Sequence, residues 1–199
     1  MEFKTIDELF AAGDAARRKF IDYVSHLDAG DTELLPEGEK WSIAQIVEHV
    51  SIVDEGIIKI CRRLLKRAEA DGAASDGGIQ FSDEFLQKSA GLAKAKIEAP
   101  EMVHPKGRPI HGSISALEAN LEEIAGLRQL FDTVNGSVRK FPHPALGEIS
   151  AQEWFAVGIH HQGRHLRQII KLLARIKAQK SPGYEEGGIT GAPIEKSPY

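Results

Sequence analysis

The stretch 41-WSIAQIVEHVSIVDEGIIKICRRLLKRAEA-70 decides the fold that we expect for this chain. Ser42 precedes Gln45 by three residues, a spacing at which the two side chains can satisfy free backbone N–H groups at the start of a helix. From Ile43 to Ala68 the apolar residues recur every three or four positions, which places them on one face of a helix. The stretch therefore predicts a long amphipathic helix that buries one face in a protein core.

The same start signature occurs at three other places in the sequence. It consists of Ser or Thr followed three residues later by Glu or Gln, and its further copies are Thr5/Glu8, Ser115/Glu118 and Ser150/Glu153. Each copy precedes a segment with the apolar spacing of a helix, and these segments are 6–27, 117–134 and 154–176. Four amphipathic helices of about 20–30 residues pack most simply as a four-helix bundle. We therefore expect an all-α fold of this type.

Three segments fall outside the four expected helices. Residues 28–41 read as a loop with Gly and Pro, and residues 72–112 as a long connection with a short helix around 83–97. A connection of this length usually has a function of its own, and it can cross the bundle from end to end, so the second and third helices need not be antiparallel neighbours. The bundle domain is expected to span 1–178, and the Gly-, Pro- and charge-rich tail 179–199 to be loosely ordered or docked on a partner.

The composition indicates one globular domain. The chain has 199 residues, of which 42% are hydrophobic and 27% charged, enough to bury a core of ordinary size. Its formal net charge of −4 gives no excess of positive charge that would attract nucleic acid or an anionic membrane. The start of the chain lacks a signal-peptide pattern, no stretch approaches the roughly 20 apolar residues of a membrane span, and the lone Cys61 cannot form an internal disulfide. These features favour a cytoplasmic protein.

Polar residues on the apolar faces are the candidates for function. In the last helical segment, His161 and His165 lie one turn apart in the middle of the apolar face, and Gly158 leaves space beside them. The neighbouring His160 falls on the charged face, so we expect it at the surface. In the second helix, His49 lies on the apolar face. Three histidines from two helices are therefore expected to point into the core.

Histidines that converge in this way suit a divalent transition metal. Neutral imidazole is a strong ligand for such ions, and three protein ligands leave at least one position open, as in catalytic rather than structural sites. The set His49, His161 and His165 is therefore the candidate metal site. The alternative is a metal-free bundle in which the histidines bond to one another and to Asp54, because each buried ring nitrogen needs a partner.

The remaining polar residues have simpler interpretations. Asp54 lies on a neighbouring stripe of the second helix, where it can hydrogen-bond a ligand histidine. We favour instead that it pairs with an Arg or Lys or lies at the bundle edge. Cys61 is expected to fill the core, and His104, His111 and His143, which lie in Pro-rich loops, are expected to be exposed.

Three stretches of the sequence resemble the DinB-like (DinB/YfiT) superfamily of four-helix metalloproteins. Residues 41–49 (WSIAQIVEH) look like the family's Trp-Ser segment that leads to the first ligand, and residues 143–150 (HPALGEIS) are similar to the turn before its last helix. Residues 161–169 (HQGRHLRQI) are close to the family's closing pattern. The resemblance runs from the first helix to about Lys177, and all three of the family's metal positions hold a histidine in this chain.

The resemblance implies a divalent metal, often nickel or zinc, and for many members a homodimer. Characterised members include transferases and isomerases that use low-molecular-weight thiols such as bacillithiol, mycothiol or glutathione, and others are known only as metal-dependent hydrolases. The family name comes from DNA-damage induction and implies no binding to nucleic acid. The partners expected from the resemblance are therefore a small-molecule thiol or substrate and a second copy of the chain.

Two functional hypotheses follow from these observations. The leading one is a metal-dependent enzyme whose three-histidine site activates a thiol for S-transfer, or water for hydrolysis. The competing one is a non-catalytic four-helix module that binds a metal or a ligand. The sequence indicates no general base, and residues 72–112 are expected to line the substrate.

Overall fold

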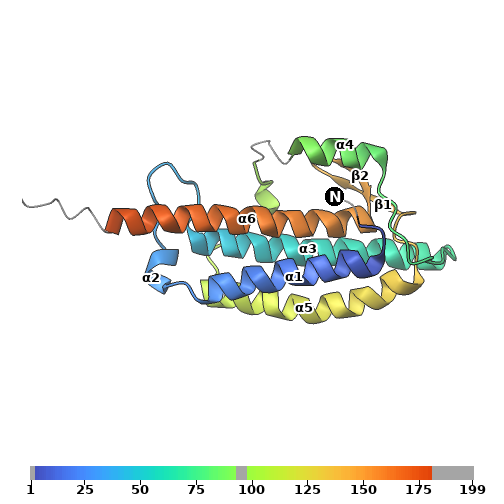
Figure 1. Ribbon diagram of the computed structural model, residues 1–199, viewed down its shortest axis with the longest axis horizontal. Coiled ribbons are helices and arrows are strands. Elements are labelled where there is room, and N and C mark those ends of the chain that lie inside the picture. The colour runs from blue at the N-terminus through green and yellow to red at the C-terminus, as the bar shows by residue number, and fades with distance from the viewer. Residues whose placement is uncertain (1–2, 93–97, 181–199) are drawn as a thin grey trace, which may run out of the picture.

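Four long helices form the body of the molecule (Figure 1). The computed structural model describes residues 3–92 and 98–180, and the tail from 181 onward lies outside the described residues. The long helices are α1 (Ile6–Ser25), α3 (Ile43–Ala70), α5 (Ile110–Thr133) and α6 (Ala151–Lys180). The shorter elements are α2 (Ala29–Thr32), α4 (Asp83–Leu92), the 3-10 helix η1 (Glu101–Val103), β1 (Lys140–His143) and β2 (Gly147–Ser150). The four-helix bundle is confirmed.

The helices α3 and α5 run in the same direction. Glu48 near the start of α3 accepts a hydrogen bond from the backbone of Arg108, directly before α5, and further along the two helices Arg62 pairs with Glu123. The helices α1 and α6 run the opposite way, as Figure 1 shows. The chain between α3 and α5 therefore returns from one end of the bundle to the other, with α4 and η1 on its path.

The predicted start signatures are confirmed at three of the four helices. Ser42 and Gln45 form a reciprocal capping box, with the Gln45 N–H bonded to Ser42 Oγ at 3.3 Å and the Ser42 N–H bonded to Gln45 Oε1 at 2.9 Å. Ser150 and Glu153 do the same at the start of α6. Thr5 accepts the N–H of Glu8, whose carboxylate accepts the N–H of Lys4 rather than that of Thr5.

The prediction for the third helix start was wrong. Ser115 is an exposed residue inside α5, which begins at Ile110 after Pro109. Proline fixes φ near the helical value and needs no N–H partner, so it suits the entry to a helix. Ile110 and Ile114 pack against the core, and this contact stabilises the additional helical turns before Ser115.

Two further segments differ from expectation. Residues 28–41, expected to be a loop, contain the short helix α2. Residues 140–150 form an antiparallel hairpin in which Lys140 faces Ser150 and His143 faces Gly147, a strand pair that the helical pattern did not indicate. The hairpin buries Leu146 and Ile149 at the end of the bundle. The short helix expected around 83–97 is present as α4 up to Leu92, and residues 93–97 lie outside the described residues.

A layer of polar side chains divides the core into two apolar clusters. The first cluster gathers around Phe10, Phe131 and Phe155 near the hairpin, and the second around Phe20 and Val47 toward the other end. Between them each long helix contributes one buried polar residue, and together Arg17, Asp54, Asn120 and Gln162 form what we call the polar layer. The candidate metal histidines lie beside this layer, because His161 directly precedes Gln162 along α6.

None of the described helices is long and apolar enough to span a membrane.

Candidate metal centre

The structure brings the three predicted histidines together. His49 from α3 and His161 from α6 approach through their Nε2 atoms at 3.1 Å, and His165 Nε2 lies 3.1 Å from His161 Nε2. The ligand atoms of all three residues lie within 4.8 Å of one another. The i, i+4 spacing on α6 places two rings one turn apart, and the antiparallel packing of α3 on α6 supplies the third.

The opposite ring nitrogens of two histidines already have partners. His49 Nδ1 donates to the Val103 carbonyl at 2.7 Å, and His165 Nδ1 donates to Gln168 Oε1 at 2.9 Å. A carbonyl oxygen only accepts, so these contacts place the proton of each neutral ring on Nδ1. The lone pair of Nε2 is thereby left free on both rings, and both lone pairs are directed into the cluster.

Burial keeps the rings neutral. His49 and His165 are 3% and 6% exposed, whereas His161 is half-buried. Burial lowers the pKa of His165 to about 4, with a smaller effect from His49, and holds the pKa of His161 well below its usual value, reinforced by the two neighbouring histidines. Burial also lowers the pKa of His49. At neutral pH each ring is therefore in the uncharged form that binds a metal ion.

These residues fit a divalent transition metal. The Nε2 lone pairs of His49 and His165 both point into the cluster, where His161 Nε2 lies 3.1 Å from each of these two Nε2 atoms. Imidazole nitrogen is a preferred ligand of zinc, nickel, copper and iron. A set of three protein ligands also leaves room for a further ligand, as in catalytic metal sites. The structure brings together the three histidines of the sequence-based prediction, while their binding of an ion and the identity of that ion stay predictions.

The segment around η1 covers the site. The Val103 carbonyl bonds to His49, and the Trp41 ring lies 4.9 Å from the His49 ring and 5.5 Å from the His104 ring. Just beyond, the buried Glu48 carboxylate accepts the backbone N–H groups of residues 106, 107 and 108 at 2.9–3.0 Å. Two consecutive residues of α3 thus hold one covering segment, Glu48 by its carboxylate and His49 by its ring.

Sequence reasoning missed three of these contacts. Gln168 stands three residues after His165 on the same helix, so its reach to the ring follows from helical spacing and was available from the sequence. The contact of Glu48 with residues 106–108 and that of Val103 with His49 join positions more than 50 residues apart. No local pattern indicates them.

The sequence profile of the DinB superfamily matches residues 12–169. The chain belongs to the DinB superfamily. It is 25% identical over 148 residues to the uncharacterized protein YuaE of Bacillus subtilis (strain 168), a match that covers 71% of this chain and 83% of YuaE. Among solved structures it is similar to TT2238, described as a four-helix bundle protein, with a TM-score of 0.52 and 20% identity over 84% of this chain and 99% of that one. The structural likeness supports the fold.

In this DinB-superfamily protein Asp54 pairs with Arg17 inside the polar layer, which confirms the favoured prediction of an Arg or Lys partner. Its Oδ1 accepts from Arg17 Nη2 at 3.0 Å, from Arg17 Nε at 3.2 Å and from Gln162 Nε2 at 3.1 Å, and its Oδ2 accepts from Asn120 Nδ2 at 3.1 Å. The pair is fully inside the core, with Arg17 1% and Asp54 2% exposed. Asp54 is therefore engaged by four donors from three other helices, and the idea that it bonds to the histidines was wrong.

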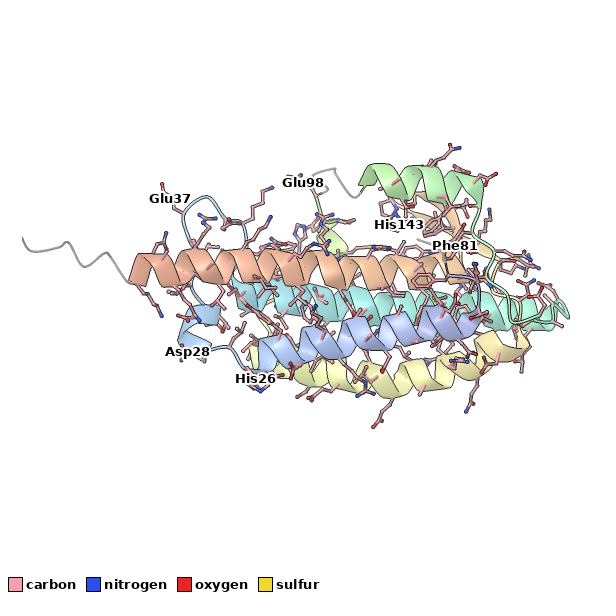
Figure 2. All side chains as sticks on the ribbon, in the orientation of Figure 1. His26, Asp28, Glu37, Phe81, Glu98 and His143 are labelled. Atoms are coloured by element: carbon pink, nitrogen blue, oxygen red, sulfur yellow. The ribbon has the colours of Figure 1, made fainter. Side chains whose placement is uncertain are left out.

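The other histidines lie where expected with two exceptions. His160 and His104 are exposed, as predicted. His111 is also exposed but lies in α5 rather than in a loop. His143 was expected to be exposed, whereas it is half-buried in β1 with its ring 5.0 Å from that of Trp154, and Figure 2 shows it between α4 and α6. The hairpin explains the difference, because it folds His143 back onto the start of α6.

The single cysteine behaves as predicted. Cys61 is fully buried, its thiol donates to the Ala151 carbonyl at 3.4 Å, and burial raises the pKa of that thiol. A thiol that stays protonated is a poor nucleophile and a poor metal ligand. The cysteine therefore fills space in the core of the DinB bundle.

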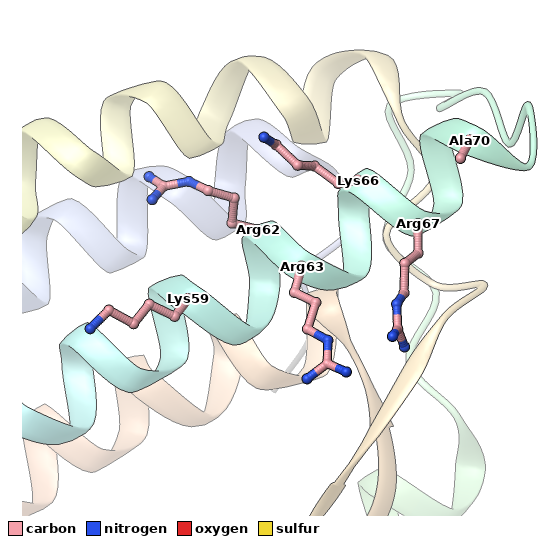
Figure 3. A pocket seen from close by; sticks show the side chains of 6 residues that line it. All are labelled: Lys59, Arg62, Arg63, Lys66, Arg67 and Ala70. Atoms are coloured by element: carbon pink, nitrogen blue, oxygen red, sulfur yellow. The ribbon is translucent and has the colours of Figure 1, made fainter.

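A surface pocket on α3 is separate from the histidine cluster. It is lined by cationic side chains and one alanine, namely Lys59, Arg62, Arg63, Lys66, Arg67 and Ala70 (Figure 3). Arg62 pairs with Glu123 and Lys59 with Glu55, and the Arg63 guanidinium lies over the Phe141 ring. None of the three histidines lines this pocket, so it contributes nothing to the candidate metal centre.

Proposed function

We propose that this protein is a metal-dependent enzyme that uses a divalent transition metal, nickel or zinc, to activate a low-molecular-weight thiol or water. The observation that carries the proposal is the convergence of three neutral Nε2 atoms, from His49, His161 and His165, with the Nδ1 protons of two rings directed away from the cluster. A bound divalent metal would lower the pKa of a thiol or water beside it and so supply a nucleophile at neutral pH.

The residues around the site support a catalytic role. His161 is half-buried, whereas His49 and His165 are almost fully buried, so the cluster lies at the edge of the core. Trp41 and Val103 shield the His49 side from water. Apolar shielding strengthens the electrostatic effect of a bound ion on a neighbouring group, because it lowers the local dielectric constant.

The family resemblance favours a thiol over water as the activated group. S-transfer to an electrophile and hydrolysis would use the same three histidine ligands and differ in the non-protein ligand of the ion, which is a thiol in the first case and water in the second. An assay with and without added thiol therefore distinguishes the two reactions.

Metal analysis of protein purified without a polyhistidine tag tests metal binding. We expect about one equivalent of a transition metal in the wild-type protein and less than about a tenth of an equivalent in the double variant His161→Ala/His165→Ala. The matched control is His26→Ala/His111→Ala, which removes two exposed histidines and should keep the wild-type metal content. A wild-type content as low as that of the double variant would overturn the proposal.

An activity assay then tests catalysis. The metal-loaded protein is incubated with glutathione, bacillithiol or mycothiol and an aryl halide electrophile, and product formation is compared with that of the metal-free protein. We expect turnover with at least one thiol only when metal is present. Metal binding without turnover of any thiol or of ester substrates would favour the non-catalytic module.

A further inference from the structure

Gln168 contacts the outer face of a candidate metal ligand. Its Oε1 lies 2.9 Å from His165 Nδ1, while the Nε2 of the same ring faces the other two histidines. Gln168 stands three residues after His165 on α6 and is half-buried. It does not reach the point where the three Nε2 atoms meet, so any influence on a bound ion passes through the His165 ring.

The two tautomers of a neutral histidine differ in which nitrogen can bind a metal. With the proton on Nδ1, the Nε2 lone pair of His165 is directed into the cluster, and with the proton on Nε2 that lone pair is lost. An amide oxygen accepts a hydrogen bond and cannot donate one, so Gln168 Oε1 stabilises the Nδ1–H form. The same contact fixes the rotation of the ring about its χ2 angle.

His49 receives the same support from a different source. Its Nδ1 donates to the backbone carbonyl of Val103, which no side-chain substitution can remove. Of the two outer contacts, only that of Gln168 is carried by a side chain and can therefore be deleted, restored or strengthened by mutation. This makes Gln168 the position at which the role of the outer contacts can be tested.

We propose that Gln168 is a positioning residue of the metal centre, which sets the tautomer and orientation of His165 so that its Nε2 can bind the ion. The inference rests on the proposed metal site and deepens it. Partners of this kind raise metal affinity because the ligand atom is already aimed and deprotonated before the ion arrives.

The variants Gln168→Leu, Gln168→Glu and Gln179→Leu test the inference. The leucine removes the acceptor at similar volume, the glutamate keeps an acceptor oxygen, and Gln179 is an exposed glutamine on the same helix that serves as the matched control. Zinc affinity is measured by competition with a chromophoric chelator. We expect Gln168→Leu to weaken zinc binding by about 10–100-fold, whereas Gln168→Glu and Gln179→Leu stay close to the wild type.

The tautomer of His165 gives a readout that does not depend on metal or activity. In ¹⁵N-labelled metal-free protein, NMR should show His165 protonated at Nδ1 in the wild type and shifted toward Nε2–H in Gln168→Leu. A Gln168→Leu protein with the wild-type tautomer and the wild-type zinc affinity would overturn the inference, and so would equal losses in the Leu and Glu variants. A wild-type protein that binds no metal, but whose His165 tautomer shifts in Gln168→Leu, would refute the metal proposal and leave only the control of the His165 tautomer by Gln168.

Discussion

Two polar clusters, the polar layer and the histidine cluster, interrupt the core of this bundle at neighbouring levels. They differ in whether the cluster itself contains a cation. In the polar layer, the Asp54 carboxylate receives four hydrogen bonds, two of them from the Arg17 guanidinium, so the chain itself supplies the compensating cation. In the histidine cluster, the Nε2 atoms of three neutral rings meet, and His161 Nε2 contacts those of His49 and His165. The first cluster contains its own cation, whereas the second joins neutral rings whose nitrogens form a donor set that suits an added cation.

The difference shows how a buried polar group can be assigned to structure or to function. Both clusters contain residues that an apolar core disfavours, and both have ordered, short contacts. The charge inside each cluster separates them, because the polar layer pairs a guanidinium with a carboxylate, whereas the histidine cluster contains only neutral rings. Convergent imidazole nitrogens fit a ligand site, while a carboxylate surrounded by donors fits a packing role.

The largest effect is expected from breaking the polar layer. Arg17→Met removes the cation beside Asp54 and leaves a carboxylate buried among apolar groups and two amides. The free energy of unfolding, measured by urea denaturation, should fall by about 3–5 kcal/mol. The double variant Arg17→Met/Asp54→Leu should recover a large part of that loss, because it removes the uncompensated charge. An Arg17→Met protein as stable as the wild type would show that the pair does not hold the layer.

A smaller effect is expected from filling the space beside Arg17. A Cβ atom at Gly13 would lie 2.8 Å from Arg17 Nη1 and 2.9 Å from Phe155 Cε1, and both neighbours are buried. Overpacking should outweigh the better helix propensity of alanine, so Gly13→Ala should lower the free energy of unfolding by about 1–2 kcal/mol.

The matched control for this substitution is Gly126→Ala on α5, where an added Cβ meets nothing within 4 Å. That variant should be unchanged or more stable by up to about 1 kcal/mol. If both alanine variants were equally stabilised, the tight fit around Arg17 would be refuted.

The smallest effect is expected from acid, which should lower the free energy of unfolding because it protonates the histidines of the cluster in the unfolded chain. In the metal-free protein the pKa of His165 is lowered to about 4, whereas an unfolded histidine titrates near 6.5. Between these values the unfolded chain binds a proton that the folded chain does not, so stability falls as the pH falls. His165 alone should account for about 1 kcal/mol between pH 6 and pH 5.

Urea denaturation of the metal-free protein at several pH values measures this fall in the free energy of unfolding. The fall in the free energy of unfolding should be smaller in His165→Ala and unchanged in Gly13→Ala, which leaves the histidines intact. A stability that is constant from pH 6.5 to pH 4 in the wild type would contradict the neutral, buried state of the cluster.

The sequence was sufficient for the bundle and for the residues of the candidate site. The apolar spacing of α1, α3 and α6 and their start signatures are local features, and the structure confirms them. The signature at Ser115 misled because the start of α5 depends on Pro109 and on the packing of Ile110, not on a local side-chain cap. The hairpin 140–150 was missed because its short strands are stabilised by packing on α6 and show no distinctive periodicity.

What the sequence by itself determined is which side chains lie on the buried faces, since helical periodicity alone places His49, His161 and His165 there. The tertiary structure decided what those side chains meet. Only the packing of the four helices places Arg17 against Asp54, and only the return of the chain past α4 places the Val103 carbonyl on His49. Periodicity fixes the direction of a residue relative to its own helix, whereas a site depends on distances between helices, which side-chain volumes and connections set together.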